Sequence, residues 1–305
     1  MTSIESSPIS HSYRGRFAPT PSGPLHFGSL IAATGSYLQA KSQQGKWLLR
    51  IDDLDTPRVV PGAASQICKT LERYGLHWDE TIVYQSQHFE RYQAIIETLK
   101  QQQLTYYCRC TRKEIKAIGG IYLGHCRKLT NSADQSSIRV RVDQPLDGFF
   151  DKLQGEIAVE PHLAEEDFII RRRDGLYAYN LAVVVDDHQA GITEVVRGAD
   201  LLSTTVRQRH LYQLMRWPEP DYLHLPLAVE SHGHKLSKQN HAPALDLDNP
   251  EPQLWLALKF LGLKPPLELH QAPVEEQLEW AGSKWNPAQL PCQREIELSD
   301  ISRQA

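Results

Sequence analysis

Two polar segments of the chain combine residue types that suit the binding of phosphates. The first reads RFAPTPSGPLHFGS over residues 16–29 and leads into the apolar run 30–33. A strand that enters a turn rich in proline and glycine, and then a helix, leaves free backbone N–H groups facing the turn. Gly23 and Gly28 let the backbone approach a ligand, and His26 can donate a hydrogen bond to an oxyanion. Alone, the pattern fits either a phosphate site or a buried turn with a satisfied histidine.

The second segment reads HKLSKQ over residues 234–239. Lys235 and Lys238 flank a small hydroxyl residue, Ser237, in a loop that follows an apolar, strand-like run. Two ammonium groups on such a loop suit a triphosphate that must be held and then released as pyrophosphate. Together the two segments favour a site for ATP.

Three of the five cysteines lie close together in the sequence, namely Cys108, Cys110 and Cys126. Soft thiolates favour tetrahedral zinc, and four ligands would close the shell of a structural ion. On chemistry alone the fourth ligand is His125. The alternative is a set of three reduced thiols without a metal.

The first hundred residues predict an α/β fold with a parallel sheet. Residues 47–51 are typical of a buried strand, and residues 64–74 and 92–102 are typical of helices. The acidic segment 52–58 follows the strand, at the end where open α/β sheets bind ligands.

Strand-like segments at 137–142 and 168–172 interrupt this alternation. We then expect a strand over 182–187, a helix over 201–215 and a packed helix around 255–261. The nucleotide-binding fold is therefore predicted to be split. Its first half covers residues 13–105 and its second half, with the lysine loop, covers residues 179–243. An inserted zinc-containing module covers residues 106–178, and a short helical C-terminal region covers residues 244–305.

Composition limits the kind of protein. The chain has 305 residues, of which 41% are hydrophobic, and no long apolar stretch, so we expect a substantial core, no membrane span and a cytoplasmic location. A net charge of −4 argues against non-specific coating of nucleic acid, yet local clusters such as Arg171–Arg173 could contact RNA phosphates.

The two phosphate segments resemble the signatures of class I aminoacyl-tRNA synthetases, His-Ile-Gly-His and Lys-Met-Ser-Lys-Ser. Residues 16–19, with the sequence Arg-Phe-Ala-Pro, are similar to the glutamyl branch, and most closely to its members that glutamylate queuosine in tRNA(Asp). The chain departs from the signatures at Phe27, Ser29, Leu236 and Gln239. Catalysis at the first signature is therefore expected to rest on His26 and main-chain donors.

The resemblance implies a function in two steps. L-glutamate is activated by ATP with Mg²⁺, without tRNA, and is then transferred to queuosine in the anticodon loop of tRNA(Asp). Little room follows the lysine loop for an anticodon-binding domain. The alternatives are a truncated glutamyl-tRNA synthetase that charges a tRNA 3′ end, and a non-catalytic zinc-containing RNA-binding module. No obligate protein partner is inferred.

The resemblance also implies roles for individual residues. The catalytic residues are His26, Lys235 and Lys238. The residues that bind ATP are Pro19, Ser22, Gly23, His26, Gly28, Ser29, Lys235, Ser237 and Lys238. The residues that bind glutamate are Arg16, Phe17, Ala18, Pro19, Thr20, Asp52, Tyr179 and Arg197. The ligands of one structural zinc are Cys108, Cys110, Tyr122 and Cys126.

Within the glutamate set, the arginines suit the two carboxylates and Tyr179 offers a hydroxyl. Asp52 matches an acidic position that receives the amino group. That family position is commonly glutamate, so the neighbouring Asp53 is an alternative for this role.

Overall fold

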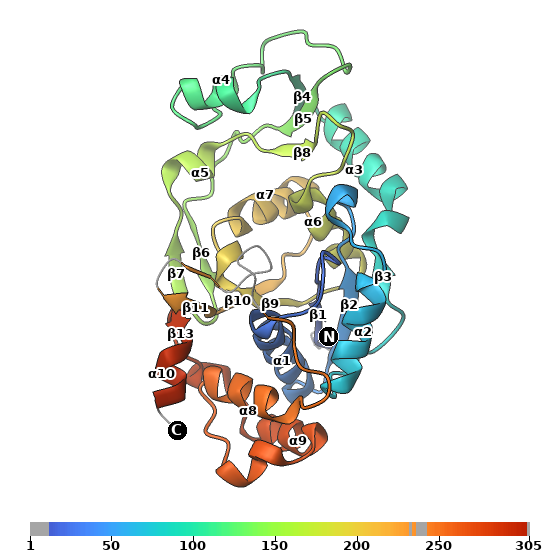
Figure 1. Cartoon of the computed structure of the whole chain (residues 1–305). Coiled ribbons are helices and arrows are strands. Elements are labelled where there is room, and N and C mark those ends of the chain that lie inside the picture. The colour runs from blue at the N-terminus through green and yellow to red at the C-terminus, as the bar shows by residue number, and fades with distance from the viewer. Residues whose placement is uncertain (1–11, 232–233, 236–242, 304–305) are drawn as a thin grey trace, which may run out of the picture.

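A parallel sheet forms the centre of the molecule (Figure 1). The structure is a computed structural model that describes residues 12–231, 234–235 and 243–303. In the sheet, β1 (Arg14–Phe17) pairs with β2 (Lys46–Ile51), and β2 pairs with β3 (Val83–Tyr84). The strand predicted over 47–51 is confirmed, and all five of these residues are buried, Arg50 included, as in a strand that is covered on both faces.

A second parallel pair extends this sheet. It consists of β9 (Glu194–Gly198) and β10 (Asp221–Leu225). Thr193, just before β9, donates its N–H to the carbonyl of Arg14 at 2.9 Å, so β9 lies beside β1. Strand β1 therefore lies between β2, which follows it in the chain, and β9, which the chain reaches only after the inserted segment.

Helices follow the strands as the sequence predicts. They are α1 (Phe27–Ser42), α2 (Ala63–Arg73) and α3 (Phe89–Gln101). The helix expected over 201–215 is also present, as α7 (Thr205–Met215) preceded by a short 3-10 turn at Ala199–Leu201.

The strand predicted over 182–187 is wrong, because these residues lie in helix α6 (Tyr179–Gln189). Every residue from Leu181 to Asp187 is buried. A helix that is covered on all sides has the same unbroken apolar run as a buried strand, and periodicity does not separate the two.

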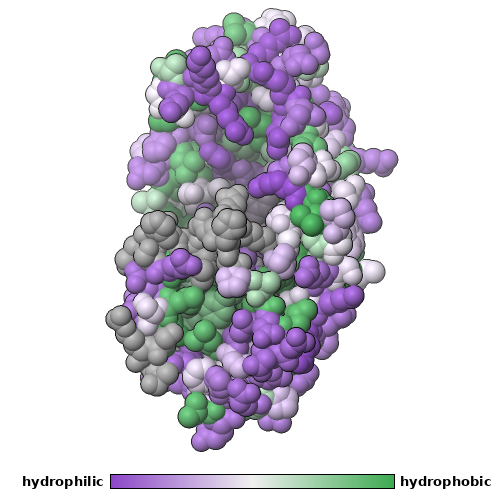
Figure 2. Space-filling model, viewed as in Figure 1, coloured by the Kyte–Doolittle hydropathy of each residue, from purple (hydrophilic) through white to green (hydrophobic). Residues whose placement is uncertain are grey.

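The inserted segment forms its own antiparallel sheet at the top of Figure 1. Its strands are β4 (Thr105–Cys108), β5 (Ser137–Val140) and β8 (Ile169–Arg171), and a hairpin of β6 (Gly148–Asp151) and β7 (Gly155–Ala158) extends toward β10. The short helices are α4 (Arg112–Ala117) and α5 (Pro161–Glu165). This part of the molecule shows a mostly hydrophilic surface (Figure 2).

The C-terminal region is mainly helical. It contains α8 (Glu251–Phe260), α9 (Val274–Lys284) and α10 (Leu298–Arg303), and both α8 and α9 pack against α1. The helix predicted around 255–261 is therefore confirmed. A small sheet joins β11 (Leu227–Ser231) to β12 (His234–Lys235) and β13 (Glu295–Glu297). Further 3-10 turns lie at Thr56–Arg58, Gln85–Gln87, Leu267–Gln271 and Pro287–Gln289.

No helix in the described part of the chain is both long enough and apolar enough to cross a bilayer.

Candidate active site

A pocket opens at the carboxyl ends of β1 and β9. These neighbouring strands connect to opposite sides of the sheet, and such a reversal leaves a crevice in which open α/β sheets bind ligands. The predicted site residues that line the pocket are Arg16, Phe17, Ala18, Pro19, Thr20, Ser22, His26, Gly28, Ser29, Tyr179 and Arg197.

The other predicted residues lie elsewhere. Gly23 is in the turn before α1, with a φ of 132° that favours glycine. Asp52 lines an adjoining pocket, which shares Thr20 and Tyr179 with the first. The backbone of Lys235 belongs to β12. Ser237 and Lys238 lie outside the described residues.

The N-terminus of α1 forms one wall of the pocket. The helix begins at Phe27, with His26 as an extended N-cap, and Gly28 and Ser29 of the first turn line the pocket. The first N–H groups of a helix have no partner within it, and they carry the positive end of its dipole. Because the first turn of α1 contains no acidic residue, this wall suits an anionic phosphate.

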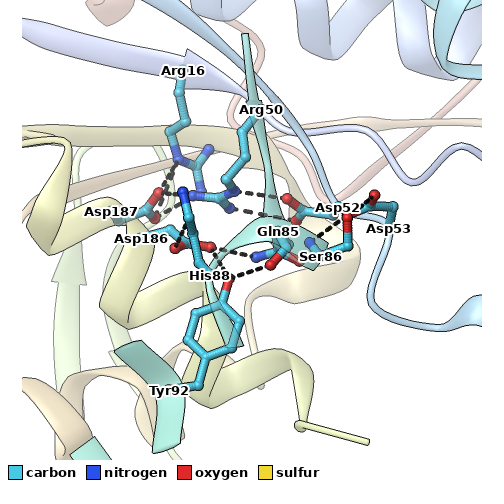
Figure 3. A network of polar contacts seen from close by, with 10 residues as sticks. All are labelled: Arg16, Arg50, Asp52, Asp53, Gln85, Ser86, His88, Tyr92, Asp186 and Asp187. Atoms are coloured by element: carbon cyan, nitrogen blue, oxygen red, sulfur yellow. Dashed lines mark hydrogen bonds and ion pairs between the residues drawn. The ribbon is translucent and has the colours of Figure 1, made fainter. Parts of the chain in front are cut away.

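A buried ion-pair network underlies the pocket (Figure 3). Arg16 and Arg50 share the carboxylate of Asp187: Arg16 Nε lies 3.2 Å and Arg50 Nη1 lies 2.5 Å from its Oδ1. Arg50 Nε also contacts Asp52 Oδ1 at 2.7 Å. Each of these four side chains is only 5% exposed, so their charges depend on one another.

The two carboxylates of this network differ in acidity. Burial opposes ionisation of Asp187, but the two adjacent guanidinium groups hold its pKa below the usual value. Asp52 has one guanidinium partner, and burial raises its pKa to about 6. A cation placed beside Asp52 would therefore favour its ionised form.

Asp53, the alternative to Asp52, is already engaged. Its carboxylate accepts hydrogen bonds from the backbone N–H of Ser86 at 2.8 Å and from the Ser86 hydroxyl at 2.6 Å (Figure 3). Asp53 lines neither of the two pockets. Asp52 is paired as well, with Arg50, but it is the one of these two residues that lines a pocket.

Arg197 has one unused donor. It lies on β9 with only 6% of its surface exposed. Nε donates to His224 Nε2 at 3.1 Å and Nη2 donates to Thr205 Oγ1 at 2.8 Å. Nη1 is buried and has no hydrogen-bond partner among the described residues. Because an unpaired buried donor is unfavourable, this nitrogen suits a carboxylate ligand.

Sequence reasoning missed several residues of the site. Asp187 could have been noticed as part of an acidic pair that ends an apolar run, while His224 and Thr205 carry no comparable signal. The remaining pocket residues come from α1 and the turn before it, from the carboxyl ends of β9 and β10 with the turns that follow them, and from the start of β11. They are Leu25, Ile31, Ala32, Val196, Gly198, Asp200, Leu201, Leu225, Pro226, Leu227 and Ala228.

The three clustered cysteines meet in the inserted segment. The sulfur atoms of Cys108, Cys110 and Cys126 all lie within 4.8 Å of one another, and those of Cys110 and Cys126 are 3.5 Å apart. A tetrahedral zinc with bonds of about 2.3 Å spaces its sulfurs by about 3.8 Å. The donor set therefore fits a metal ion. His125 is exposed and does not belong to the cluster.

A crevice at the switch point of a parallel sheet, with a helix N-terminus on its wall, is typical of α/β nucleotide-binding proteins. The family model of class I tRNA synthetases (E and Q), catalytic domain, matches residues 12–249. The chain belongs to this family of aminoacyl-tRNA synthetases.

Relatives and solved structures agree with this assignment. The chain is 57% identical over 287 residues to a glutamyl-Q tRNA(Asp) synthetase of Photobacterium profundum, covering 94% of this chain and 93% of the relative. It is 56% identical over 279 residues to the protein of that name from Escherichia coli (strain K12), covering 92% and 91%. A glutamate tRNA ligase of Elizabethkingia meningosepticum CCUG26117 shares the fold, with a TM-score of 0.78 at 24% identity, over 96% of this chain and 68% of that one.

Proposed function

We propose that this protein acts in the cytoplasm, where it activates L-glutamate with ATP in the absence of tRNA and transfers the glutamate to queuosine in the anticodon loop of tRNA(Asp). Relatives that carry the name glutamyl-Q tRNA(Asp) synthetase, at over 50% identity along nearly the whole chain, support this function. The structural observation that carries it is the unpaired Nη1 of Arg197, in a residue that lines the same pocket as the N-terminus of α1.

The first step is attack of the α-carboxylate of glutamate on the α-phosphorus of ATP. A carboxylate–phosphorus bond forms and the bond to pyrophosphate breaks, so no covalent enzyme nucleophile is needed. His26 and the N–H groups of α1 would stabilise the developing phosphate charge, and Lys235 and Lys238 would follow the β- and γ-phosphates. Mg²⁺, bound with ATP, would neutralise part of the triphosphate charge.

The amino acid would lie between charged groups of opposite sign. Arg197 would bind one carboxylate, Arg16 would stand near the other, and Asp52 would receive the ammonium group. The Tyr179 hydroxyl and the backbone of residues 17–20 would complete the pocket. Glutamine would leave a buried guanidinium opposite a neutral amide, and aspartate would fall short of it, so glutamate is favoured.

The second step is attack by a hydroxyl of the queuosine cyclopentenediol on the activated carbonyl. An ester bond forms, AMP leaves with the electrons of the broken carbonyl–phosphate bond, and the proton of the attacking hydroxyl is released. The second candidate function, charging of a tRNA 3′ end, uses the same adenylate with a different hydroxyl. The fold shared with a glutamate tRNA ligase is the observation that favours this alternative.

The cysteine cluster would hold one structural zinc ion, with Tyr122 as the fourth ligand beside the three thiolates. The Tyr122 hydroxyl oxygen accepts a hydrogen bond from the backbone N–H of Cys126 at 2.9 Å, which places it next to the cluster. The Arg139 guanidinium lies 3.7 Å from the centre of the Tyr122 ring, and this cation–π contact holds the ring in place beside the cysteines. The ion would tie the end of β4 to the loop that carries Cys126.

Exchange of pyrophosphate into ATP tests the first step. We expect exchange that depends on L-glutamate, needs no tRNA and is not supported by glutamine or aspartate. Exchange that requires tRNA, or that glutamine supports equally well, would contradict the proposal.

A further inference from the structure

Asp151 lies in the inserted segment, yet it contacts the central sheet. It ends β6, and its side chain is fully buried. Its carboxylate accepts the N–H groups of Leu153 at 3.0 Å and Gln154 at 2.9 Å, and the N–H of His224 on β10 at 3.2 Å. The turn of the hairpin therefore wraps around this carboxylate and holds it against β10.

The ring of His224 joins Asp151 to Arg197. Its Nδ1 lies 2.6 Å from Asp151 Oδ2, and its Nε2 lies 3.1 Å from Arg197 Nε. A guanidinium nitrogen only donates, so Nε2 accepts, and the ring proton on Nδ1 is donated to Asp151. His224 is thus neutral, in agreement with burial that lowers its pKa to about 4.

Two further contacts fix the guanidinium of Arg197. Thr205 Oγ1 accepts from its Nη2 at 2.8 Å, and the Tyr222 ring lies with its centre 5.6 Å from the guanidinium carbon. The Tyr222 ring is itself stacked on His224, at 6.1 Å between centres and 10° between planes. With Nε and Nη2 both engaged, Nη1 is the nitrogen left for a ligand.

We infer that Asp151 and His224 are positioning residues for recognition of the amino acid: together they fix the guanidinium of Arg197 so that its Nη1 meets a substrate carboxylate. Neither residue lines the pocket, and both act through Arg197. The inference rests on the proposed activation of glutamate. It gives the inserted segment a part in the amino acid site, because Asp151 belongs to that segment.

Three variants test this role in the pyrophosphate exchange assay. Asp151→Asn weakens the acceptor for the ring proton, and His224→Ala removes the acceptor for Arg197 Nε. His224→Gln is the conservative variant, because its side-chain oxygen can take the place of Nε2. The control is Glu194→Gln. The carboxylate of Glu194 is buried like that of Asp151, and Glu194 lies on β9, as Arg197 does, but it begins the strand and does not line the pocket.

We expect Asp151→Asn and His224→Ala to raise the KM for glutamate about tenfold or more, with the KM for ATP changed less than about twofold, because each loses a hydrogen bond to a charged group. His224→Gln should recover most of the affinity for glutamate, and Glu194→Gln should leave both KM values near those of the wild type. Circular dichroism and thermal unfolding establish that each variant is folded.

Two results would overturn the inference. One is an unchanged KM for glutamate in folded Asp151→Asn and His224→Ala, or no recovery in His224→Gln. The other is an equal rise of both KM values in all variants, including Glu194→Gln, which would indicate a general structural effect. Absence of glutamate-dependent exchange in the wild type would instead overturn the proposed function, and with it this inference.

Discussion

Arg16 and Asp187 form a buried ion pair beneath the candidate site, with Arg16 Nε 3.2 Å from Asp187 Oδ1 and Arg16 Nη2 3.2 Å from Asp187 Oδ2. Arg16 comes from β1 and lines the pocket, whereas Asp187 comes from the buried helix α6. Arg50 shares the same carboxylate. The carboxylate of Asp187 thus contacts two buried guanidinium groups, of which that of Arg50 also pairs with Asp52, and it holds Arg16 in place before a ligand arrives.

Asp187→Asn should destabilise the protein strongly, because it leaves two buried guanidinium groups without this countercharge. We expect a loss of about 3–5 kcal/mol in the free energy of unfolding, measured with urea. Glu80→Gln is the control, since Glu80 pairs with Arg14 at the surface and its loss should cost less than about 1 kcal/mol. Similar small losses in both variants would show that Asp187 does not hold the network together.

Arg197→Gln should impair activation of glutamate and spare the binding of ATP. Removing a buried charged partner of the carboxylate is expected to lower kcat/KM for glutamate about 100-fold in pyrophosphate exchange. Arg209→Gln is a matched control, because Arg209 pairs with Glu219 and does not line the pocket. A rise confined to the KM for ATP would place the glutamate site elsewhere.

Metal content tests the zinc assignment. We expect about one zinc per chain after purification, lost in Cys126→Ser and retained in Cys68→Ser, since Cys68 lies outside the cluster. Tyr122→Phe should release zinc to a competing chelator more readily than the wild type, because it lacks the phenolate oxygen. Equal zinc retention by Tyr122→Phe would remove Tyr122 from the ligand set.

The neutral state of His224 predicts a dependence of stability on pH. Burial lowers its pKa from 6.5 to about 4, so between these values the unfolded chain binds a proton here and the folded chain does not. The stability gained from the neutral ring is complete above about pH 6.5 and is lost as the pH falls toward 4. Relative to His224→Gln, the wild type should lose up to about 1.4 kcal/mol per pH unit in this range.

Urea unfolding of both proteins at several pH values measures this difference. Asp52, whose pKa is about 6, titrates in the same range in both proteins, so its contribution cancels in the comparison. A difference that does not vary with pH would mean that His224 is not buried in its neutral form.

Local signals in the sequence predicted much of the site. The turn before α1 has the proline, glycine and histidine pattern of a helix entry, and residues 47–51 are apolar except for Arg50, as in a buried strand. Both lie as expected, and most of the predicted residues of the first segment line one pocket. The cysteine spacing likewise predicted a cluster that the fold brings together.

Long-range contacts account for what the sequence did not reveal. Helix α6 has a valine-rich run that favours a strand, and its burial by the surrounding fold explains why a helix carries such a run. The contact of His224 with Asp151 joins residues far apart in the chain, through a hairpin whose position depends on the whole fold. No local pattern encodes such a pair.

Transfer of labelled L-glutamate to purified tRNA(Asp), with and without queuosine and alongside tRNA(Glu), tests the proposed function most directly. We predict transfer to tRNA(Asp) only when it contains queuosine, in a linkage that remains after the 3′-terminal adenosine is removed. Charging of tRNA(Glu) at its 3′ end, with no transfer to queuosine-containing tRNA(Asp), would contradict the proposal and favour a glutamyl-tRNA synthetase.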